Sequence, residues 1–455
     1  MNSHPRNDAD RAGASGLSRR SVLSAMALAA PAVALGWDAA PAWAAPGKPL
    51  FVSAPRAAFE SSGLPPIVIE HKPSGSAQAG VQLAISFRGG ITWSDGTRAA
   101  RKLTTGSDGR ITLRGLRTPS TAGWTGIVAT AASGTSVASI TVNTGTPQSR
   151  LQNVVDFRFG MFNHFNLGTF TDEEWAAGGQ SPSLFAPAQV DCGQWADAAA
   201  AAGMTFGVLT TKHHDGFALW PTAFGSQNVA NSGYTQDIVR SYVDAFRSRG
   251  MRVGLYFSVW DRTHTVQGYG GYHVSDPSES IEPSDLTYTL GQIRELLTNY
   301  GAIDFFITDG YAWQMGQRNI SIQAVRELVH SLQPNCILID HGGLSTPWLG
   351  DAIYFEEPLG IRSPAGNTLA SVQGQTISNG WFWHPSTPYE GLMSTNDIVG
   401  HLADLEPKYT TFLLNCPPNR DGRLDANVVA RLAEVGATWR PNESRPALPA
   451  QPLRV

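Results

Sequence analysis

Cysteine is scarce in this chain of 455 residues, which has only Cys192, Cys336 and Cys416. Three scattered thiols are too few for a disulfide framework or a zinc site. Basic charge is also lacking: the formal net charge is −4, whereas a binder of nucleic acid or of a membrane surface would need a basic patch. The G-x-S-x-G pattern of a serine nucleophile elbow does not occur.

A long membrane-spanning run is lacking too. The apolar run Val22–Leu35 is shorter than the ~20 residues of a spanning helix, and Pro31 interrupts it. Arg19-Arg20 precede the run, and Ala42-Trp43-Ala44 follows as a small-x-small cleavage site. This order predicts a twin-arginine export signal over residues 1–44. We therefore expect a bacterial protein that is secreted or extracytoplasmic.

What is present fits a folded protein of two domains. A length of 455 residues exceeds the ~250–300 residues at which single cores stop growing. The hydrophobic fraction of 42% excludes wholesale disorder. The 13 tryptophans are many for a soluble protein, and they serve either as core filling or as flat surfaces for stacking on ligands such as sugars.

Residues 45–150 are predicted to form an all-β domain and a linker. Short β-branched or alternating runs recur, with turn signals between them, over Ile67–Ile69, Val81–Phe87, Ile111–Leu113, Ile127–Ala131 and Val137–Val142. This spacing indicates a β-sandwich, and residues 104–142 resemble a bacterial immunoglobulin-like domain. This domain could act as a spacer, bind sugars or cover the next domain, and we favour a structural role. Thr144–Arg150 is a polar linker.

Residues 151–440 alternate between strand and helix patterns, and a Pro-rich tail follows over residues 441–455. The eight strand candidates are Phe159–Asn163, Phe206–Thr211, Val253–Phe257, Ile303–Thr308, Ile337–Asp340, Ala352–Phe355, Gly380–Trp383 and Thr411–Asn415. Helix candidates include Cys192–Met204, Thr235–Arg249, Leu286–Tyr300 and Ile322–Leu332. The pattern predicts an α/β fold, a (β/α)₈ or TIM barrel, whose chemistry lies at the carboxyl ends of the strands.

The predicted strand ends are rich in His, Asp, Glu and Trp, and three chemistries compete for them. A zinc hydrolase needs converging histidines, but consecutive His213 and His214 point to opposite sides of an extended strand. Two carboxylates from different strands instead suit glycoside hydrolysis, in which one attacks the sugar and the other protonates the leaving oxygen. Asp309 and Glu356 are the natural pair, although Asp-Gly is also a turn former. Glu357 is the reserve, because alternation alone does not say which glutamate faces the barrel.

Several linked motifs carry a resemblance to a known family. They are FGMFNHF (159–165), VLTTKHHDGFALWPT (208–222), DIVRSYVDAFRSRGMRVGLYFSVWD (237–261), IRELLTNYGAI (293–303), ITDG (307–310) and FLLNCPPNRDGRL (412–424). Over residues 155–440 the chain thereby resembles the α-L-fucosidases of glycoside hydrolase family 29. GTFTDEEWAAG (168–178), SVWDR (258–262) and GWFWHP (380–385) are similar to the subfamily that cuts α-1,3 and α-1,4 branches.

The resemblance implies a retaining fucosidase without a cofactor or metal, acting on fucosylated oligosaccharides or glycoconjugates. Asp309 would be the nucleophile and Glu356, or Glu357, the acid/base. The implied sugar-binding residues are His164, Glu174, Trp175, His213, His214, Tyr256, Trp260 and Trp381. The chain departs from the family pattern at Thr308, at Phe165 and at Asp340-His341-Gly342, where a sugar-contacting arginine is missing. A sugar-binding barrel without turnover and a metal-dependent hydrolase using the three histidines are the competing hypotheses.

Overall fold

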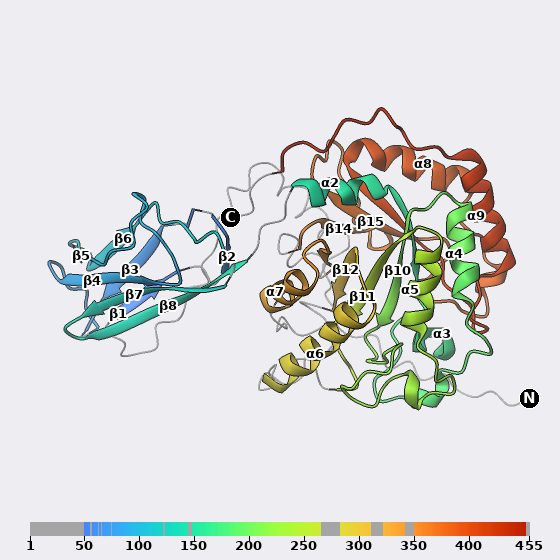
Figure 1. Ribbon diagram of the computed structural model, residues 1–455, viewed down its shortest axis with the longest axis horizontal. Helices are drawn as coiled ribbons and strands as arrows, with labels where there is room; N and C mark the ends of the chain where they lie inside the picture. The colour runs from blue at the N-terminus through green and yellow to red at the C-terminus, as the bar shows by residue number, and fades with distance from the viewer. Residues whose placement is uncertain are drawn as a thin grey trace, which may run out of the picture.

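The computed structural model describes residues 50–54, 57–61, 63–64, 66–73, 75–121, 123–143, 148–264, 283–310, 322–341 and 350–451. The predicted export signal, residues 1–44, lies outside these ranges. Figure 1 shows two bodies, a smaller one made of strands β1 to β8 and a larger one in which helices surround strands.

The smaller body consists of two sheets around one core. One sheet has the order β1 (Leu50–Ser53), β3 (Ile67–His71) and β6 (Arg110–Leu113). The other has the order β2 (Ala57–Phe59), β8 (Gly134–Asn143), β7 (Gly123–Ala131), β4 (Gln82–Arg88) and β5 (Arg101–Thr104). Alternate residues point inward, so Ile67 and Ile69 of one sheet share a buried cluster with Leu83 and Ile85 of the other. The five predicted strands are present, whereas β1, β2 and β5 were not predicted.

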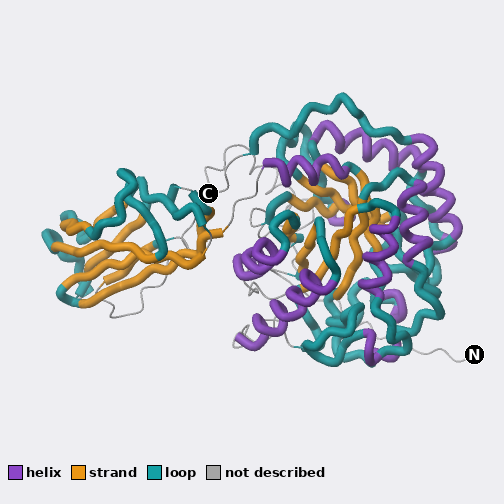
Figure 2. The backbone as a smooth tube through the Cα atoms, in the orientation of Figure 1, coloured by secondary structure: helices purple, strands orange, loops and turns teal. Residues whose placement is uncertain are grey.

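Eight parallel strands form the larger body. They are β9 (Phe159–Asn163), β10 (Phe206–Lys212), β11 (Arg252–Ser258), β12 (Phe305–Asp309), β13 (Ile337–Asp340), β14 (Ile353–Glu356), β15 (Ser371–Thr376) and β16 (Thr410–Asn415). They pair in the order β13-β12-β11-β10-β9-β16-β15-β14. Figure 2 shows these strands inside a ring of helices. The predicted barrel is therefore confirmed as a nearly closed α/β barrel.

The last seam of the barrel, between β13 and β14, has little backbone pairing and is reinforced by a side chain. The backbone links there are one bridge between Ile339 and Ala352 and a hydrogen bond of 2.6 Å from the Asp351 N–H to the Leu338 carbonyl. Beside it, the Asp351 carboxylate accepts a hydrogen bond of 2.8 Å from the backbone N–H of Leu338. Arg326 and His330 hold the same carboxylate at 2.6 and 2.9 Å. Buried polar groups thus complete the barrel where the sheet hydrogen bonds stop.

Helices cover the outside of the barrel because each buries one apolar stripe. They are α2 (Gln148–Phe157), α3 (Leu167–Thr171), α4 (Cys192–Ala201), α5 (Ile238–Ser248), α6 (Pro283–Asn299), α7 (Ile322–Leu332), α8 (Thr395–Leu405) and α9 (Ala426–Thr438). In α5, the Asp237 side chain caps the first turn by accepting from the backbone N–H of Arg240 at 2.8 Å. Val239, Tyr242 and Phe246 then recur on its buried face. The four predicted helices are all present: α7 has the predicted bounds, and the ends of the other three are shifted by at most three residues.

Two predictions about local structure were wrong. The seventh strand is Ser371–Thr376, whereas Gly380–Trp383 forms the loop that follows it. The apolar run GWFW is typical of a strand. The observed strand, SVQGQT, contains two glutamines and a glycine, which are not typical of a buried strand. Gln373 is tolerated there because its side chain pairs with the backbone N–H of Ser363 and with Glu357. The predicted linker also ends earlier, because α2 begins at Gln148.

The tail packs against α2 as far as Gln451. The Gln148 side chain donates to the backbone carbonyls of Leu448 and Pro449 at 3.0 and 2.9 Å. Leu448 joins a buried cluster with Leu151 and Val155 of that helix. Within the described ranges, no helix is long and apolar enough to span a bilayer.

Candidate active site

The predicted acidic pair and most of the predicted sugar-binding residues come together at the carboxyl ends of the barrel strands. His164 follows β9, His213 and His214 follow β10, Tyr256 lies near the end of β11, Asp309 ends β12 and Glu356 ends β14. Parallel strands bring these ends to one rim, which is where barrel enzymes carry their chemistry.

Asp309 is held by four groups around its carboxylate. Tyr256 donates its hydroxyl to Oδ2 at 2.6 Å, and the backbone N–H of Gly310 donates to Oδ1 at 2.6 Å. His341 Nδ1 lies 3.3 Å from Oδ1, and His214 Nε2 lies 3.9 Å from Oδ2. Burial opposes ionisation, but the charge and hydrogen bond of His341, aided by His214 and Tyr256, hold the pKa of Asp309 well below its ordinary value. The carboxylate is therefore ionised at neutral pH.

Gly310 makes this arrangement possible. Its φ is +85°, which favours glycine, and a Cβ there would lie 2.5 Å from Cβ of Trp260 and 2.8 Å from Oγ of Ser258. The Gly310 N–H donates to the carboxylate of the preceding residue, Asp309. Asp309 thus ends a buried strand, and the glycine after it helps to orient its carboxylate.

Glu356 and Glu357 face opposite sides of the barrel wall. Glu356 lies at the rim, with its Oε2 3.9 Å from Nε2 of His341. Burial, opposed by His341 and reinforced by Asp309, raises the pKa of Glu356. The rim therefore carries two carboxyl groups whose pKa values are displaced in opposite directions.

Glu357 points outward. It accepts from Gln373 at 2.7 Å and from His401 at 2.9 Å, and Arg362 lies at 2.7 Å. Burial raises the pKa of Glu357, but these partners outweigh it and lower the pKa below the ordinary value. A carboxyl group that stays ionised on the outer face is badly placed to protonate a leaving group at the mouth. The geometry therefore does not favour Glu357, the predicted reserve, as an acid/base.

His164, His213 and His214 form a contiguous group, here called the histidine cluster. The strand β10 shifts register between Thr210 and Lys212, so the consecutive rings end only 4.1 Å apart. The His213 ring lies 6.1 Å from that of His164. Burial lowers the pKa of His164 to about 3 and that of His214 to about 4, and lowers that of His213 as well. Neutral imidazoles of this kind can exchange hydrogen bonds with sugar hydroxyls.

Trp381 walls the rim beside the histidine cluster, and the predicted ligand Glu174 supports it from behind. The Trp381 ring lies 4.8 Å from that of His164. The Glu174 carboxylate accepts from the backbone N–H groups of Trp381 and Phe382 at 2.8 and 3.3 Å, and pairs with His384 at 2.8 Å. Glu174 thereby holds the loop after β15 in position.

Trp175 and Trp260 occupy different depths. Trp175 is half-buried and meets the His214 ring edge-on at 5.4 Å. Trp260 has no exposed surface and packs against both Trp175 and His214, at 5.7 and 4.9 Å. Trp260 was predicted to contact the sugar, but in this structure it is buried beneath Trp175 and His214.

His341 is the rim residue whose role the sequence did not reveal. It was noted only as a departure after strand five, yet it lies between Asp309 and Glu356. Burial would lower its pKa, but the two carboxylates raise the pKa of His341 to about 9, so it is charged at neutral pH. The strand-end rule pointed to it, because the residue before it, Asp340, pairs with Thr308, which precedes Asp309.

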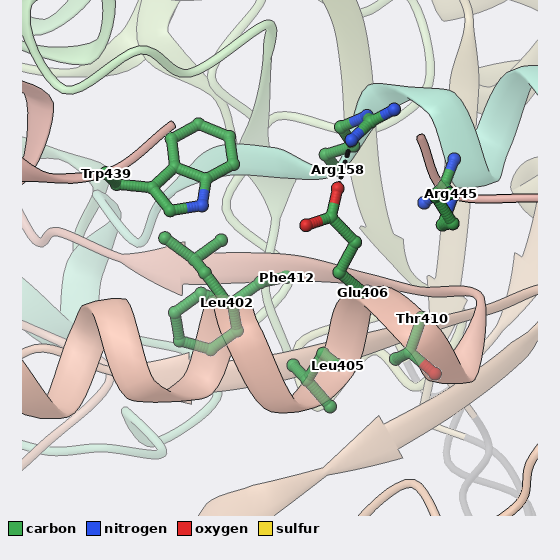
Figure 3. A pocket seen from close by; sticks show the side chains of 8 residues that line it. All are labelled: Arg158, Leu402, Leu405, Glu406, Thr410, Phe412, Trp439 and Arg445. Carbon is green, nitrogen blue, oxygen red and sulfur yellow. Dashed lines mark hydrogen bonds and ion pairs between the residues drawn. The ribbon is translucent and has the colours of Figure 1, made fainter. Parts of the chain in front are cut away.

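Two other kinds of site differ from the rim. Among the described residues, no group of three or more His, Cys, Asp or Glu side chains is arranged to hold a metal ion. Figure 3 shows a small pocket lined by Arg158, Leu402, Leu405, Glu406, Thr410, Phe412, Trp439 and Arg445. Arg158 precedes β9 and Thr410 begins β16, so this pocket lies at the amino ends of the strands. It is at the opposite end of the barrel from the carboxylates.

Comparison with known proteins agrees with this geometry. The family model for α-L-fucosidase matches residues 129–443. The chain is 31% identical over 300 residues to α-L-fucosidase 1 of Arabidopsis thaliana, covering 60% of this chain and 56% of that one. It is 33% identical over 276 residues to plasma α-L-fucosidase of Rattus norvegicus, covering 56% and 55%. The chain thus spans about half the length of the curated relatives it matches.

A solved structure shares the barrel. α-L-Fucosidase isoenzyme 1 from Paenibacillus thiaminolyticus superposes with a TM-score of 0.54 and 29% identity, covering 64% of this chain and 76% of that one. The family model covers well over half of the 455 residues and includes every strand of the barrel. The chain belongs to the α-L-fucosidase family, glycoside hydrolase family 29.

Proposed function

We propose that this protein is a retaining exo-glycosidase that hydrolyses terminal α-L-fucosyl linkages. The observation that supports it best is the pair of carboxyl groups at one barrel rim whose pKa values are displaced in opposite directions. Asp309 stays ionised and can attack a carbon, whereas Glu356 is favoured in its protonated form and can donate a proton. A pair of this kind suits double displacement.

In the first step, an Asp309 oxygen forms a bond to the anomeric carbon of the fucosyl group. The bond from that carbon to the leaving oxygen breaks, and the Glu356 proton passes to the leaving oxygen. In the second step, a water oxygen bonds to the anomeric carbon as the ionised Glu356 takes its proton. The ester bond to Asp309 breaks, which returns both carboxyl groups to their starting states and releases fucose with its configuration retained.

The remaining rim residues supply binding. Nδ1 of His164 is hydrogen-bonded to Asn415 and Nδ1 of His214 to Ser258, so each of these neutral rings has its Nε2 left for a sugar hydroxyl. Trp381 offers an apolar face beside them, suited to the C5 methyl group or to the ring of a deoxy sugar. Glu174 supports the sugar site through the loop that it holds.

Three finer assignments extend this proposal. The sequence runs GTFTDEEWAAG, SVWDR and GWFWHP support α-1,3 and α-1,4 fucosyl branches as the preferred linkages. Residues 1–44 support export from a bacterial cell by the twin-arginine route. The two-sheet domain is assigned an immunoglobulin-like, structural role, because the described part of it offers a shared apolar core and no cluster of chemical groups comparable to the rim.

Release of fucose tests the proposal. The purified chain is incubated with oligosaccharides that carry α-1,2-, α-1,3- or α-1,4-linked fucose, with and without a branching galactose, and free fucose is measured. The anomer formed first is followed by proton NMR, and α-fucose is expected. Binding without release from any of these fucosides would favour a sugar-binding barrel that has lost turnover. Full activity after chelation would remove a metal-dependent hydrolase.

A further inference from the structure

This inference rests on the proposed function and deepens it. We infer that His341, charged as an imidazolium, is a positioning residue that orients Asp309 and balances whichever of the two rim carboxyl groups is ionised. The observation that carries it is the location of one ring between both groups, with Nδ1 3.3 Å from Asp309 and Nε2 3.9 Å from Glu356.

The ring has little freedom to move. The backbone N–H of His341 donates to the carbonyl of Thr308 at 2.7 Å, which continues the pairing of β13 with β12. The imidazole packs on the Tyr354 ring with centroids 4.1 Å apart, and only 10% of the His341 side chain is exposed. The cation is therefore placed by the barrel strands themselves, rather than by a loop.

During the proposed reaction the negative charge moves from one rim carboxyl group to the other, so the His341 ring has to face an anion from either nitrogen. A neutral ring has one N–H and one lone pair, so it could donate to Asp309 or to Glu356 but not to whichever of them is ionised. An imidazolium donates from both nitrogens. Asp309 on β12 and Glu356 on β14 are the carboxyl groups that face it. Tyr354 and Tyr256 face it with neutral rings, and the histidine cluster beyond them is uncharged.

A fixed cation at this place serves both halves of the reaction. Before the first step, the negative charge is on Asp309 while Glu356 holds its proton. In the fucosyl-enzyme, Asp309 is an ester and the negative charge is on Glu356. The charge has moved from one side of the His341 ring to the other, and the imidazolium faces it in either state. Among the described residues, Lys212 pairs with Asp261 and Arg262 donates to the carbonyls of Trp175 and Ala176, so these two cations are engaged elsewhere.

Replacing His341 by glutamine tests the inference through the pH dependence of kcat/KM for a fucosylated trisaccharide, because its leaving group needs the Glu356 proton. Loss of the cation raises the pKa values of both Asp309 and Glu356, so both limbs of the pH profile should move to higher pH, by about one to three pH units. The value of kcat/KM at the optimum should fall about a hundred-fold, because Asp309 loses a group that orients it. His341→Arg, which keeps a cation, should keep the limbs near their wild-type positions.

His401→Gln is the matched control. It removes another histidine whose pKa is raised by a carboxylate, but its partner, Glu357, lies on the outer face and keeps Arg362 and Gln373. In this variant both limbs of the pH profile of kcat/KM should stay at their wild-type positions. A His341→Gln enzyme that is slower at every pH with unmoved limbs would overturn the inference, because a packing role predicts that result. Wild-type enzyme that releases no fucose would overturn the proposed function instead.

A second measurement covers the case in which His341→Gln does not fold. In ¹⁵N-labelled His401→Gln protein, NMR should find a histidine ring that stays protonated through pH 8. If every imidazole in that protein has lost its proton by pH 8, His341 is neutral in the folded enzyme and the inference fails.

Discussion

Replacing Glu356 with alanine should remove the proton donor and leave the nucleophile in place. The Glu356 side chain is 15% exposed, and burial together with the Asp309 charge favours its protonated form, so water cannot readily replace it. General acid catalysis contributes about 10²- to 10⁴-fold to the rate. This corresponds to about 3–5 kcal/mol of transition-state stabilisation, which the variant should lose for a sugar leaving group.

The assay compares two leaving groups. A nitrophenolate leaves without a proton, so formation of the fucosyl-enzyme from a nitrophenyl fucoside should slow little. A fucosylated trisaccharide needs the proton and should show the full loss. Azide should rescue hydrolysis of the nitrophenyl fucoside and yield the α-fucosyl azide, because azide then attacks the enzyme ester in place of water.

Glu357→Ala is the matched control, since the same atoms are removed one residue further along the chain. Glu357 binds Gln373, His401 and Arg362 on the outer face, so its loss should lower thermal stability without changing the dependence on leaving group. If the leaving-group dependence and azide rescue occur in Glu357→Ala and not in Glu356→Ala, the placement of the acid at the mouth is refuted.

Three further predictions concern the support of the site. Glu174→Ala should release the loop that carries Trp381 and lower kcat/KM by about 10- to 100-fold, chiefly through KM; unchanged kinetics would contradict this. Lys212→Met leaves the fully buried Asp261 without its cation and should cost about 3–5 kcal/mol in denaturant unfolding; a loss no larger than that of an exposed ion pair would count against it. The free energy of unfolding should fall on both sides of about pH 6.5. Because the pKa of His341 is raised on folding, its contribution to stability is lost as the pH rises from about 6.5 to about 9. Because the pKa values of the histidine cluster are lowered on folding, the stability linked to their neutral state is lost as the pH falls from 6.5 towards about 4. Titration of unfolding midpoints in wild type and His341→Gln checks this, and the variant should lose the alkaline decline.

Much of the barrel could be predicted because its strands are short apolar runs with clear helices between them. Six of the eight predicted strands lie within one residue of the observed bounds at both ends. The seventh strand was missed because its buried glutamine finds partners only after folding, and an apolar loop nearby imitated a strand. Strand ends also identified the rim, since parallel strands must bring their carboxyl ends to one edge.

The sequence by itself predicted the alternating α/β architecture, a division into two domains and a rim of strand ends that carries Asp309, Glu356 or Glu357, and the histidine cluster. These follow from hydrophobic periodicity and strand direction, which are local properties. Only the tertiary structure decided that Glu356 faces inward and Glu357 outward, that Trp260 lies beneath the surface, and that His341 stands between the two carboxyl groups. Side-chain direction and electrostatic partners depend on which strands become neighbours, and residues far apart in the chain acquire that relation only when the barrel closes.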